Sequence, residues 1–321
     1  MTLQATAPQA AQSVPVEARA QPGCTQTRQV EWITFGLILA TYAGWAAVTA
    51  WLYPAAPVPA VLLTAVLIAF HASLTHEVLH GHPFPWRRLN EALMFAPLNL
   101  AFPYNRFRDL HLAHHQDARL TDPFDDPESN YLDPGDWERL PRWQQRLFAA
   151  QNTLLGRMAL GPGIGQVRFM AAEWRAARMG DRAVWLAWAL HVPGLALVLA
   201  WVLLATDMPL WAYLVAAYLG LSLLKIRTFL EHQAHERARG RTVIIEDRGP
   251  LALLFLNNNL HVVHHMHPRV PWYRLPRLFA QNRARYLDRN NGYYFRSYGD
   301  VFRRHFLRAK DPVPHPLWRR H

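Results

Sequence analysis

Four long apolar runs dominate the pattern of hydrophobic and polar positions, at residues 32–52, 58–75, 184–205 and 208–225. Each is close to the roughly 20 residues that a helix needs to cross the hydrocarbon core of a bilayer. A fifth apolar run, residues 93–104, is shorter and contains two prolines, so we expect it to lie at the interface or to re-enter the membrane. The pattern predicts an all-α, polytopic membrane protein with four transmembrane helices.

The segments outside these runs are polar and carry two further signals. Residues 1–28 are rich in Ala, Gln and Pro and lack the apolar core of a signal peptide, so we expect a disordered tail. Residues 137–182 mix tryptophan, arginine and short apolar groups, which is typical of helices that lie on a membrane face. Within them, the glycine- and proline-rich residues 161–165 predict a helix break, because Gly and Pro have the lowest helix propensities.

The basic residues avoid the two shortest connections between the runs. All 34 Lys and Arg residues lie before residue 32, between residues 87 and 182, or from Lys225 onward. By the positive-inside rule, we expect both termini and the long central segment to be cytoplasmic, in a membrane such as the bacterial inner membrane. The chain then divides into a cytoplasmic tail, a membrane domain and a basic cytoplasmic segment, at residues 1–28, 29–275 and 276–321.

The net charge of +11 would suggest a nucleic-acid partner in a soluble protein. In a membrane protein, anionic lipid headgroups are the simpler counter-charge, so we expect membrane lipids and no nucleic acid. The single cysteine, Cys24, excludes an internal disulfide and a thiolate metal site.

Three tight clusters contain eight of the 17 histidines: His76 and His80; His111, His114 and His115; His261, His264 and His265. On a helix, the first pair falls about 40° apart and each triplet fits within an arc of roughly 100°. Each cluster is therefore a candidate metal-binding face. At about 1.5 Å per residue, the second and fourth spans reach the inner membrane boundary near residues 78 and 228, so His76, His80 and His232 should lie at one level.

Imidazole clusters without thiolates suit zinc, iron, copper or nickel. A zinc site uses four ligands, or three and a water, whereas eight clustered histidines with His232 as a ninth fit two ions.

Two other kinds of protein, a zinc metalloprotease and a metal transporter, also bind metals through such residues. The sequence His76-Glu77-Val78-Leu79-His80 matches the His-Glu-x-x-His pattern of zinc metalloproteases, in which the glutamate activates a zinc-bound water. A protease of this type leaves the two histidine triplets unexplained. A metal transporter would place ionisable groups near the bilayer midplane, whereas these histidines collect at one face.

The three clusters, in this order and with this membrane spacing, resemble the histidine boxes of the membrane fatty acid desaturase superfamily, which also contains alkane hydroxylases and carotenoid ketolases. The resemblance covers about residues 60–275. It includes the acidic stretch from Thr121 to Pro127 and the pair Glu231-His232 after the last span.

This resemblance implies a cytoplasmic helical cap that carries a non-haem di-iron centre cycling between Fe2+ and Fe3+. Its nine implied ligands are His76, His80, His111, His114, His115, His232, His261, His264 and His265. Stearoyl-CoA desaturases have an asparagine one turn before the extra histidine, where this chain has Thr228. This departure leaves His235 as an alternative ninth ligand.

Carboxylates near the clusters could accept a hydrogen bond from the free N–H of a ligand imidazole, which orients the ring and raises its basicity. The candidates are Glu77, Asp109, Asp117, Asp126 and Glu231.

The implied reaction is oxygen-dependent desaturation of a lipid acyl chain, with O2 as co-substrate. A hydroxylase or ketolase of an alkyl or carotenoid substrate is the alternative within the superfamily, and ligand identity does not separate the two. A membrane zinc metalloprotease is the distant alternative. The chain has no nicotinamide or flavin fingerprint and no fused cytochrome b5 motif, so we expect an external electron donor such as a ferredoxin, steered by the basic cytoplasmic face.

Overall fold

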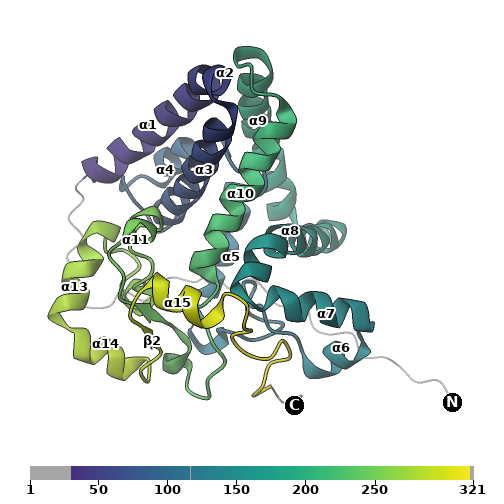
Figure 1. Ribbon diagram of the computed structural model, residues 1–321, viewed down its shortest axis with the longest axis vertical. Coiled ribbons are helices and arrows are strands. Elements are labelled where there is room, and N and C mark those ends of the chain that lie inside the picture. The colour runs from purple at the N-terminus through teal and green to yellow at the C-terminus, as the bar shows by residue number, and fades with distance from the viewer. Residues whose placement is uncertain (1–29, 116, 319–321) are drawn as a thin grey trace.

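The computed structural model describes residues 30–115 and 117–318, and the predicted tail of residues 1–28 lies outside them. Four helical segments in this part are long and apolar enough to cross a membrane, which confirms the predicted spans. They are α1 (Trp32–Ala47) with its continuation η1 (Val48–Leu52) and α2 (Tyr53–Ala55), α3 (Pro57–Leu79), α9 (Arg182–Ala205) and α10 (Leu210–Thr228). The four spans occupy the upper part of the molecule in Figure 1.

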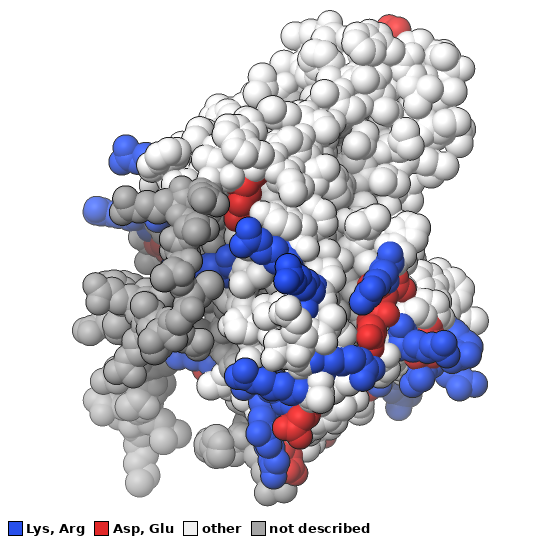
Figure 2. All heavy atoms as spheres, turned by 90° about the vertical axis from the view of Figure 1, so that its left-hand side faces the viewer, with Lys and Arg blue, Asp and Glu red and all other residues white. Residues whose placement is uncertain are grey.

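The spans expose apolar side chains on their outer faces, as expected of helices surrounded by lipid. Trp51, Leu204 and Trp211 are 79%, 85% and 66% exposed, although all three are large and apolar. Figure 2 shows that charged side chains are nearly absent from the upper part of this face and gather in the lower part. The molecule therefore has an apolar membrane part and a charged cap at one end.

Helices α3 and α10 pack closely, and both lead into the cap. A Cβ atom added at Gly220 of α10 would lie 2.8 Å from Cγ2 of Ile68 and 2.9 Å from the carbonyl oxygen of Ala65 on α3. A Cβ atom would clash at these distances, so only glycine lets the backbones of α3 and α10 approach this closely. The close contact fixes the ends of α3 and α10 relative to each other.

Most of residues 93–104 form turns that pack between the spans, where Leu98 lies in one hydrophobic cluster with Trp45, Val202 and Tyr213. Side chains of the spans reach several of their backbone carbonyl groups. The Tyr213 hydroxyl donates to the Leu98 carbonyl at 2.8 Å, and Tyr42 donates to the Leu93 carbonyl at 2.9 Å. His191 lies 3.2 Å from the Leu100 carbonyl through Nε2. Non-helical backbone at membrane depth is stable only where protein groups replace water in this way.

The cap consists of several short helices, the 25-residue helix α8 (Leu154–Arg178) and one pair of two-residue parallel strands, β1 (Ile244–Ile245) and β2 (Tyr294–Phe295). Its helices before α9 are α4 (Arg87–Leu93), α5 (Tyr104–His114), η2 (Asp117–Arg119), α6 (Pro134–Arg139), α7 (Arg142–Gln151) and α8 (Leu154–Arg178). Those after α10 are η3 (Ala238–Arg241), α11 (Pro250–Leu254), α12 (His261–Met266), η4 (Trp272–Arg274), α13 (Leu275–Gln281), α14 (Arg283–Arg289) and α15 (Tyr298–His305).

The predicted helix break at residues 161–165 is wrong, because α8 continues through it with Pro162 inside the helix. Packing against α10 overrides the low helix propensity. A Cβ atom at Gly161 would lie 3.4 Å from Cγ of Lys225, and one at Gly165 would lie 3.7 Å from its Nζ. Both glycines therefore lie against the Lys225 side chain of α10.

Residues beyond 275 share hydrophobic clusters with earlier parts of the cap. Phe295, Tyr298 and Val301 pack in the same cluster as Phe229 and Leu230, which follow α10. The C-terminal region is therefore built into the cap and packs directly against the end of the fourth span.

Candidate metal centre

Helix α3 carries the first histidine cluster at the end that meets the cap. His76 lies in its last turn and His80 at its C-cap, and they are 1% and 9% exposed. The two ring centroids are 5.1 Å apart. An i, i+4 spacing on one helix face accounts for this proximity.

The second and third clusters come from α5 and α12, which lie in the cap beneath α3. His111 and His114 lie within α5 and His115 directly follows it. All three histidines of the third cluster lie within α12, which begins at His261. His232 comes from a different kind of segment, since it follows α10 in extended backbone that pairs with Thr242.

The structure brings all nine predicted histidines together, but it divides them into two groups that cut across the clusters. Within each group, one side-chain nitrogen from every member lies within 4.8 Å of the others. We call these the first group (His76, His80, His111, His115 and His264) and the second group (His114, His232, His261 and His265).

Helix periodicity explains the division. His111 and His115, spaced i, i+4, both belong to the first group. His114 is rotated around the helix in the opposite direction from His111 and belongs to the second group. In α12, His261 and His265 join the second group, and His264 joins the first. The two groups adjoin, because the rings of His115 and His265 stack with centroids 4.2 Å apart.

Distances within the groups match those expected of ligands to one ion. Nε2 of His232 lies 2.8 Å from Nε2 of His114 and 3.1 Å from Nε2 of His261. Nε2 of His111 and Nε2 of His115 are 2.9 Å apart. Two imidazoles at right angles on one ion, with bonds of about 2.1 Å, would have nitrogens about 3 Å apart.

The first group contains buried nitrogens that have no protein partner. Nε2 of His76, of His80 and of His264 are buried and have no hydrogen-bond partner among the described residues. A buried polar atom without a partner is costly, and a metal ion would satisfy all three. The residues present therefore fit a histidine-bound metal.

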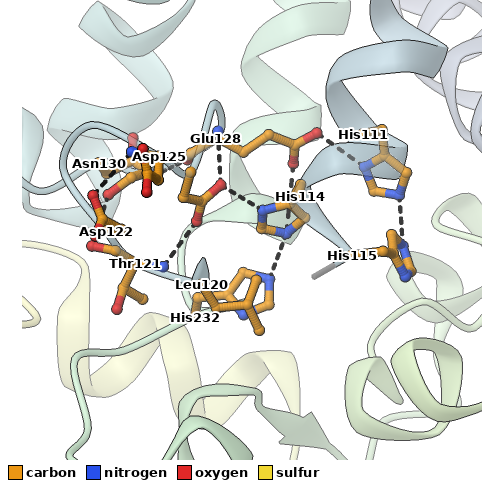
Figure 3. Close-up of polar contacts among 12 residues, drawn as sticks. His111, His114, His115, Leu120, Thr121, Asp122, Asp125, Glu128, Asn130 and His232 are labelled. Atoms are coloured by element: carbon orange, nitrogen blue, oxygen red, sulfur yellow. Dashed lines mark hydrogen bonds and ion pairs between the residues drawn. The ribbon is translucent and has the colours of Figure 1, made fainter. Parts of the chain in front are cut away.

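An acidic loop after α5 supplies hydrogen-bond partners to the histidines (Figure 3). Nδ1 of His114 donates to Asp126 at 2.7 Å, as the sequence predicts for this carboxylate. Nδ1 of His111 donates to Glu128 at 2.9 Å, and the same carboxylate lies 3.8 Å from Nε2 of His114. Sequence reasoning missed Glu128, although its position two residues after Asp126 in an acidic loop was an available signal.

The Glu231 carboxylate acts on the third cluster largely through an amide. It lies 3.8 Å from Nδ1 of His261 and forms an ion pair with Arg227 at 3.1 Å. Asn258 lies between them, because its Oδ1 is 3.0 Å from Nδ1 of His261 and its Nδ2 donates to Glu231. Asn258 is thus the direct partner of His261, with Glu231 orienting the amide.

Two other predicted carboxylates, Asp109 and Glu77, have partners other than the clustered imidazoles. Asp109 pairs with Arg108 at 2.7 Å. Glu77 accepts a hydrogen bond from the backbone N–H of Trp272 at 3.3 Å. The side chain of Asp117 lies outside the described structure.

Burial keeps most of these imidazoles neutral, which leaves a nitrogen lone pair available for a metal. It lowers their pKa values, and neighbouring imidazoles lower them further, for His80, His111, His232, His261, His264 and His265. His114 differs: burial lowers its pKa, but the carboxylates of Glu128 and Asp126 outweigh burial and raise the pKa to about 9. The same negative charge would favour a bound cation.

His235, the alternative ninth ligand, lies in neither group. Its Nδ1 accepts a hydrogen bond from the backbone N–H of Arg237 at 3.0 Å, and its Nε2 lies 3.1 Å from Nδ2 of Asn291. Both ring nitrogens therefore have protein partners away from the centre.

A polar cavity of about 40 Å³ adjoins the second group, and Thr228, Glu231 and His232 form part of its wall. Glu128 and Lys310 line another part of it. A volume of this size accommodates on the order of two water molecules, which its polar wall could hydrogen-bond.

A family model described as fatty acid desaturase matches residues 53–298, which is more than half of the chain and includes all nine histidines. The chain belongs to the fatty acid desaturase family. This confirms the resemblance found in the sequence. A comparison with curated proteins finds no match.

Membership in the desaturase family implies a membrane-bound oxidoreductase with a lipid acyl substrate. The geometry agrees with this and differs from that of a His-Glu-x-x-His protease. The first group has five histidines, whereas such a protease binds its zinc with the two histidines of the motif and one further ligand. Glu77, the residue that would act as the base, accepts a hydrogen bond from the Trp272 backbone. The family match ends at residue 298, before the last residues of the cap.

Proposed function

We propose that this member of the desaturase family introduces a double bond into a lipid acyl chain, using one iron ion at each histidine group. The observation that carries the proposal is the convergence of two adjoining groups, whose buried nitrogens lie at ligand spacing. The proposed ligands are His76, His80, His111, His115 and His264 for one iron, and His114, His232, His261 and His265 for the other.

Two iron ions bound there would supply the redox chemistry that activates O2 for hydrogen removal from an unactivated C–H bond. Burial favours the neutral form of most of the imidazoles, and hydrogen bonds to Asp126, Glu128 and Asn258 fix the orientation of His114, His111 and His261. Desaturation removes two hydrogens from the acyl chain, and O2 accepts these together with two electrons and two protons to form two waters. We propose that a separate protein such as a ferredoxin delivers the electrons.

The arrangement also supports a membrane orientation for the protein. The charged cap lies at one end of the spans, and the short connections around Ala56 and from Thr206 to Pro209 have no Lys or Arg. We propose that the cap and both termini are cytoplasmic, by the positive-inside rule. An acyl chain inserted between the spans would then reach the centre where α3 ends, at His76 and His80.

The test is a comparison of total lipids and pigments from cells that express this chain or its His265→Ala form, together with a ferredoxin and its reductase. We expect wild-type-dependent acyl chains lighter by two hydrogens in mass spectrometry, and their loss in His265→Ala. A gain of oxygen instead would identify a hydroxylase or ketolase.

Metal analysis of the purified chain is the second measurement. We expect two irons per wild-type chain and fewer in His265→Ala. A single zinc per chain, with peptide cleavage that Glu77→Gln abolishes, would contradict the proposal and identify a metalloprotease.

A further inference from the structure

The residues that follow α15 run back across the cap to the second group, beyond the end of the family match. We call residues 310–318 the C-terminal strap. In Figure 1 the yellow segment that follows α15 runs beneath that helix, at the cap end of the molecule. The strap meets two separate elements of the second group.

The first element is the loop that carries Asp126. The strap pairs with its end like a strand: the Leu132 N–H donates to the Val313 carbonyl at 3.0 Å, and the His315 N–H donates to the Leu132 carbonyl at 2.9 Å. The indole N–H of Trp318 donates to Asp133 at 2.9 Å. At the start of the loop, the Thr121 hydroxyl lies 3.3 Å from Nε2 of His315.

The second element is the backbone around His232. The Lys310 ammonium group donates to the carbonyl of His232. The next residue, Asp311, accepts a hydrogen bond from the Tyr131 hydroxyl, and that hydroxyl accepts one from the Ala234 N–H at 2.9 Å. The strap thus holds the chain at His232 and, through Tyr131, two residues after it.

Lys310 occupies an unusual position for a lysine. Its side chain is 8% exposed, its Nζ lies 3.7 Å from Asp311, and it faces the Tyr131 ring at 5.8 Å. Burying an ammonium group is unfavourable unless it is paired and hydrogen-bonded. Here the ammonium group pairs with Asp311 and donates a hydrogen bond to the backbone carbonyl of His232. His232 is the one proposed ligand that does not come from α3, α5, α12 or their caps, so its position depends on backbone contacts of this kind.

We propose that the C-terminal strap holds the second histidine group in ligand geometry, with Lys310 as its positioning residue. The inference rests on the proposal of two metal ions. Within the described residues, no hydrogen bond joins the strap to a histidine of the first group. Its direct contact with a proposed ligand is with His232 of the second group, so we expect its main effect on the ion of that group.

The test measures iron content and apparent iron affinity of the purified, iron-loaded full-length chain by competition with a colorimetric chelator. Wild type should release two irons. His261→Ala, with only the first group intact, and His76→Ala, with only the second, identify which iron is which. In Lys310→Met, we expect the second-group affinity to fall by about 10- to 100-fold, as is typical when an outer partner of a ligand is lost, with the first-group affinity unchanged.

Two further variants separate positioning from general stability. Lys310→Arg should restore most of the affinity, because a guanidinium group can donate to the same carbonyl. Arg308→Met removes an exposed positive charge two residues earlier and should change neither affinity.

Fewer than two irons in wild type would contradict the proposed function. If wild type holds two, then unchanged affinities in Lys310→Met, or an equal fall at both groups, would overturn the strap inference. Should Lys310→Met fail to fold, Trp318→Phe provides the test. It keeps an aromatic ring but removes the indole N–H bonded to Asp133, so it should weaken the second group more than the first. Unchanged second-group affinity would overturn the inference.

Discussion

The two histidine groups differ in what holds their members. All five residues of the first group lie within α3, α5 and α12 or at their C-caps, and three of them present buried nitrogens without a protein partner. The second group includes His232, which lies in extended backbone, and depends on Asp126, Asn258 and the C-terminal strap. Ligands on helices are positioned by packing, whereas a ligand on an irregular segment needs its own hydrogen bonds. The second group should therefore be the more sensitive to changes around it.

The largest effect on iron content should come from removing His232, the proposed ligand that lies in extended backbone. His232→Ala should reduce iron from two per chain toward one and abolish desaturation, because three histidines remain at the second group. The loss should exceed the roughly 10- to 100-fold typical of an outer partner. Iron content and lipid mass spectrometry measure it.

His235→Ala is the matched control, three residues away. Both nitrogens of His235 are engaged by Arg237 and Asn291, so we expect two irons and wild-type product. The reverse result, with iron lost in His235→Ala and kept in His232→Ala, would exchange the two assignments.

A smaller effect should follow from changing an outer partner of the second group. Asp126→Asn keeps the side-chain shape but removes the charge that faces Nδ1 of His114. We expect second-group iron affinity to fall by about 10- to 100-fold and first-group affinity to change much less. Chelator competition, with His76→Ala and His261→Ala as references, measures both.

Asp125→Asn removes a neighbouring, exposed carboxylate from the same loop. Its iron affinities should equal those of wild type. Equal losses in the two variants would mean that the loop acts through its total charge and that the Asp126–His114 contact has no special role.

The sequence predicted those parts of the molecule that depend on local periodicity. Long apolar runs specify the four spans, and the i, i+3, i+4 histidine spacings specify which helix faces carry imidazoles. The rise of α3 and α10 also placed His76, His80 and His232 at one level, and the structure brings them into adjoining groups.

Features that depend on tertiary contacts could not be predicted in the same way. The division of His111 and His114 between two groups follows from how α5 and α12 face each other, which no local pattern contains. The continuous helix through Gly161 packs against α10, a contact that the local sequence does not contain. Lys310 contacts the His232 carbonyl across 78 residues of sequence, and nothing in its local surroundings indicates this partner.

Among the described side chains, Glu128 is the carboxylate whose contacts reach both groups, and removing its charge should have the smallest and least selective effect. Its Oε1 accepts from Nδ1 of His111 at 2.9 Å, and its Oε2 lies 3.8 Å from Nε2 of His114. Glu128→Gln keeps an acceptor for His111 and loses the charge. Because the side chain is 30% exposed, water screens that charge, and exposed pairs contribute only about 0.2 to 1 kcal/mol.

We therefore expect both iron affinities to fall together by a few-fold in Glu128→Gln, measured by chelator competition. Glu138→Gln on α6 removes an exposed negative charge elsewhere in the cap and should leave both affinities unchanged. A change confined to the second group would mean that the charge acts through His114 alone. Glu128 would then affect the iron affinity of the second group only, and the two groups would differ more than their shared contact with this carboxylate indicates.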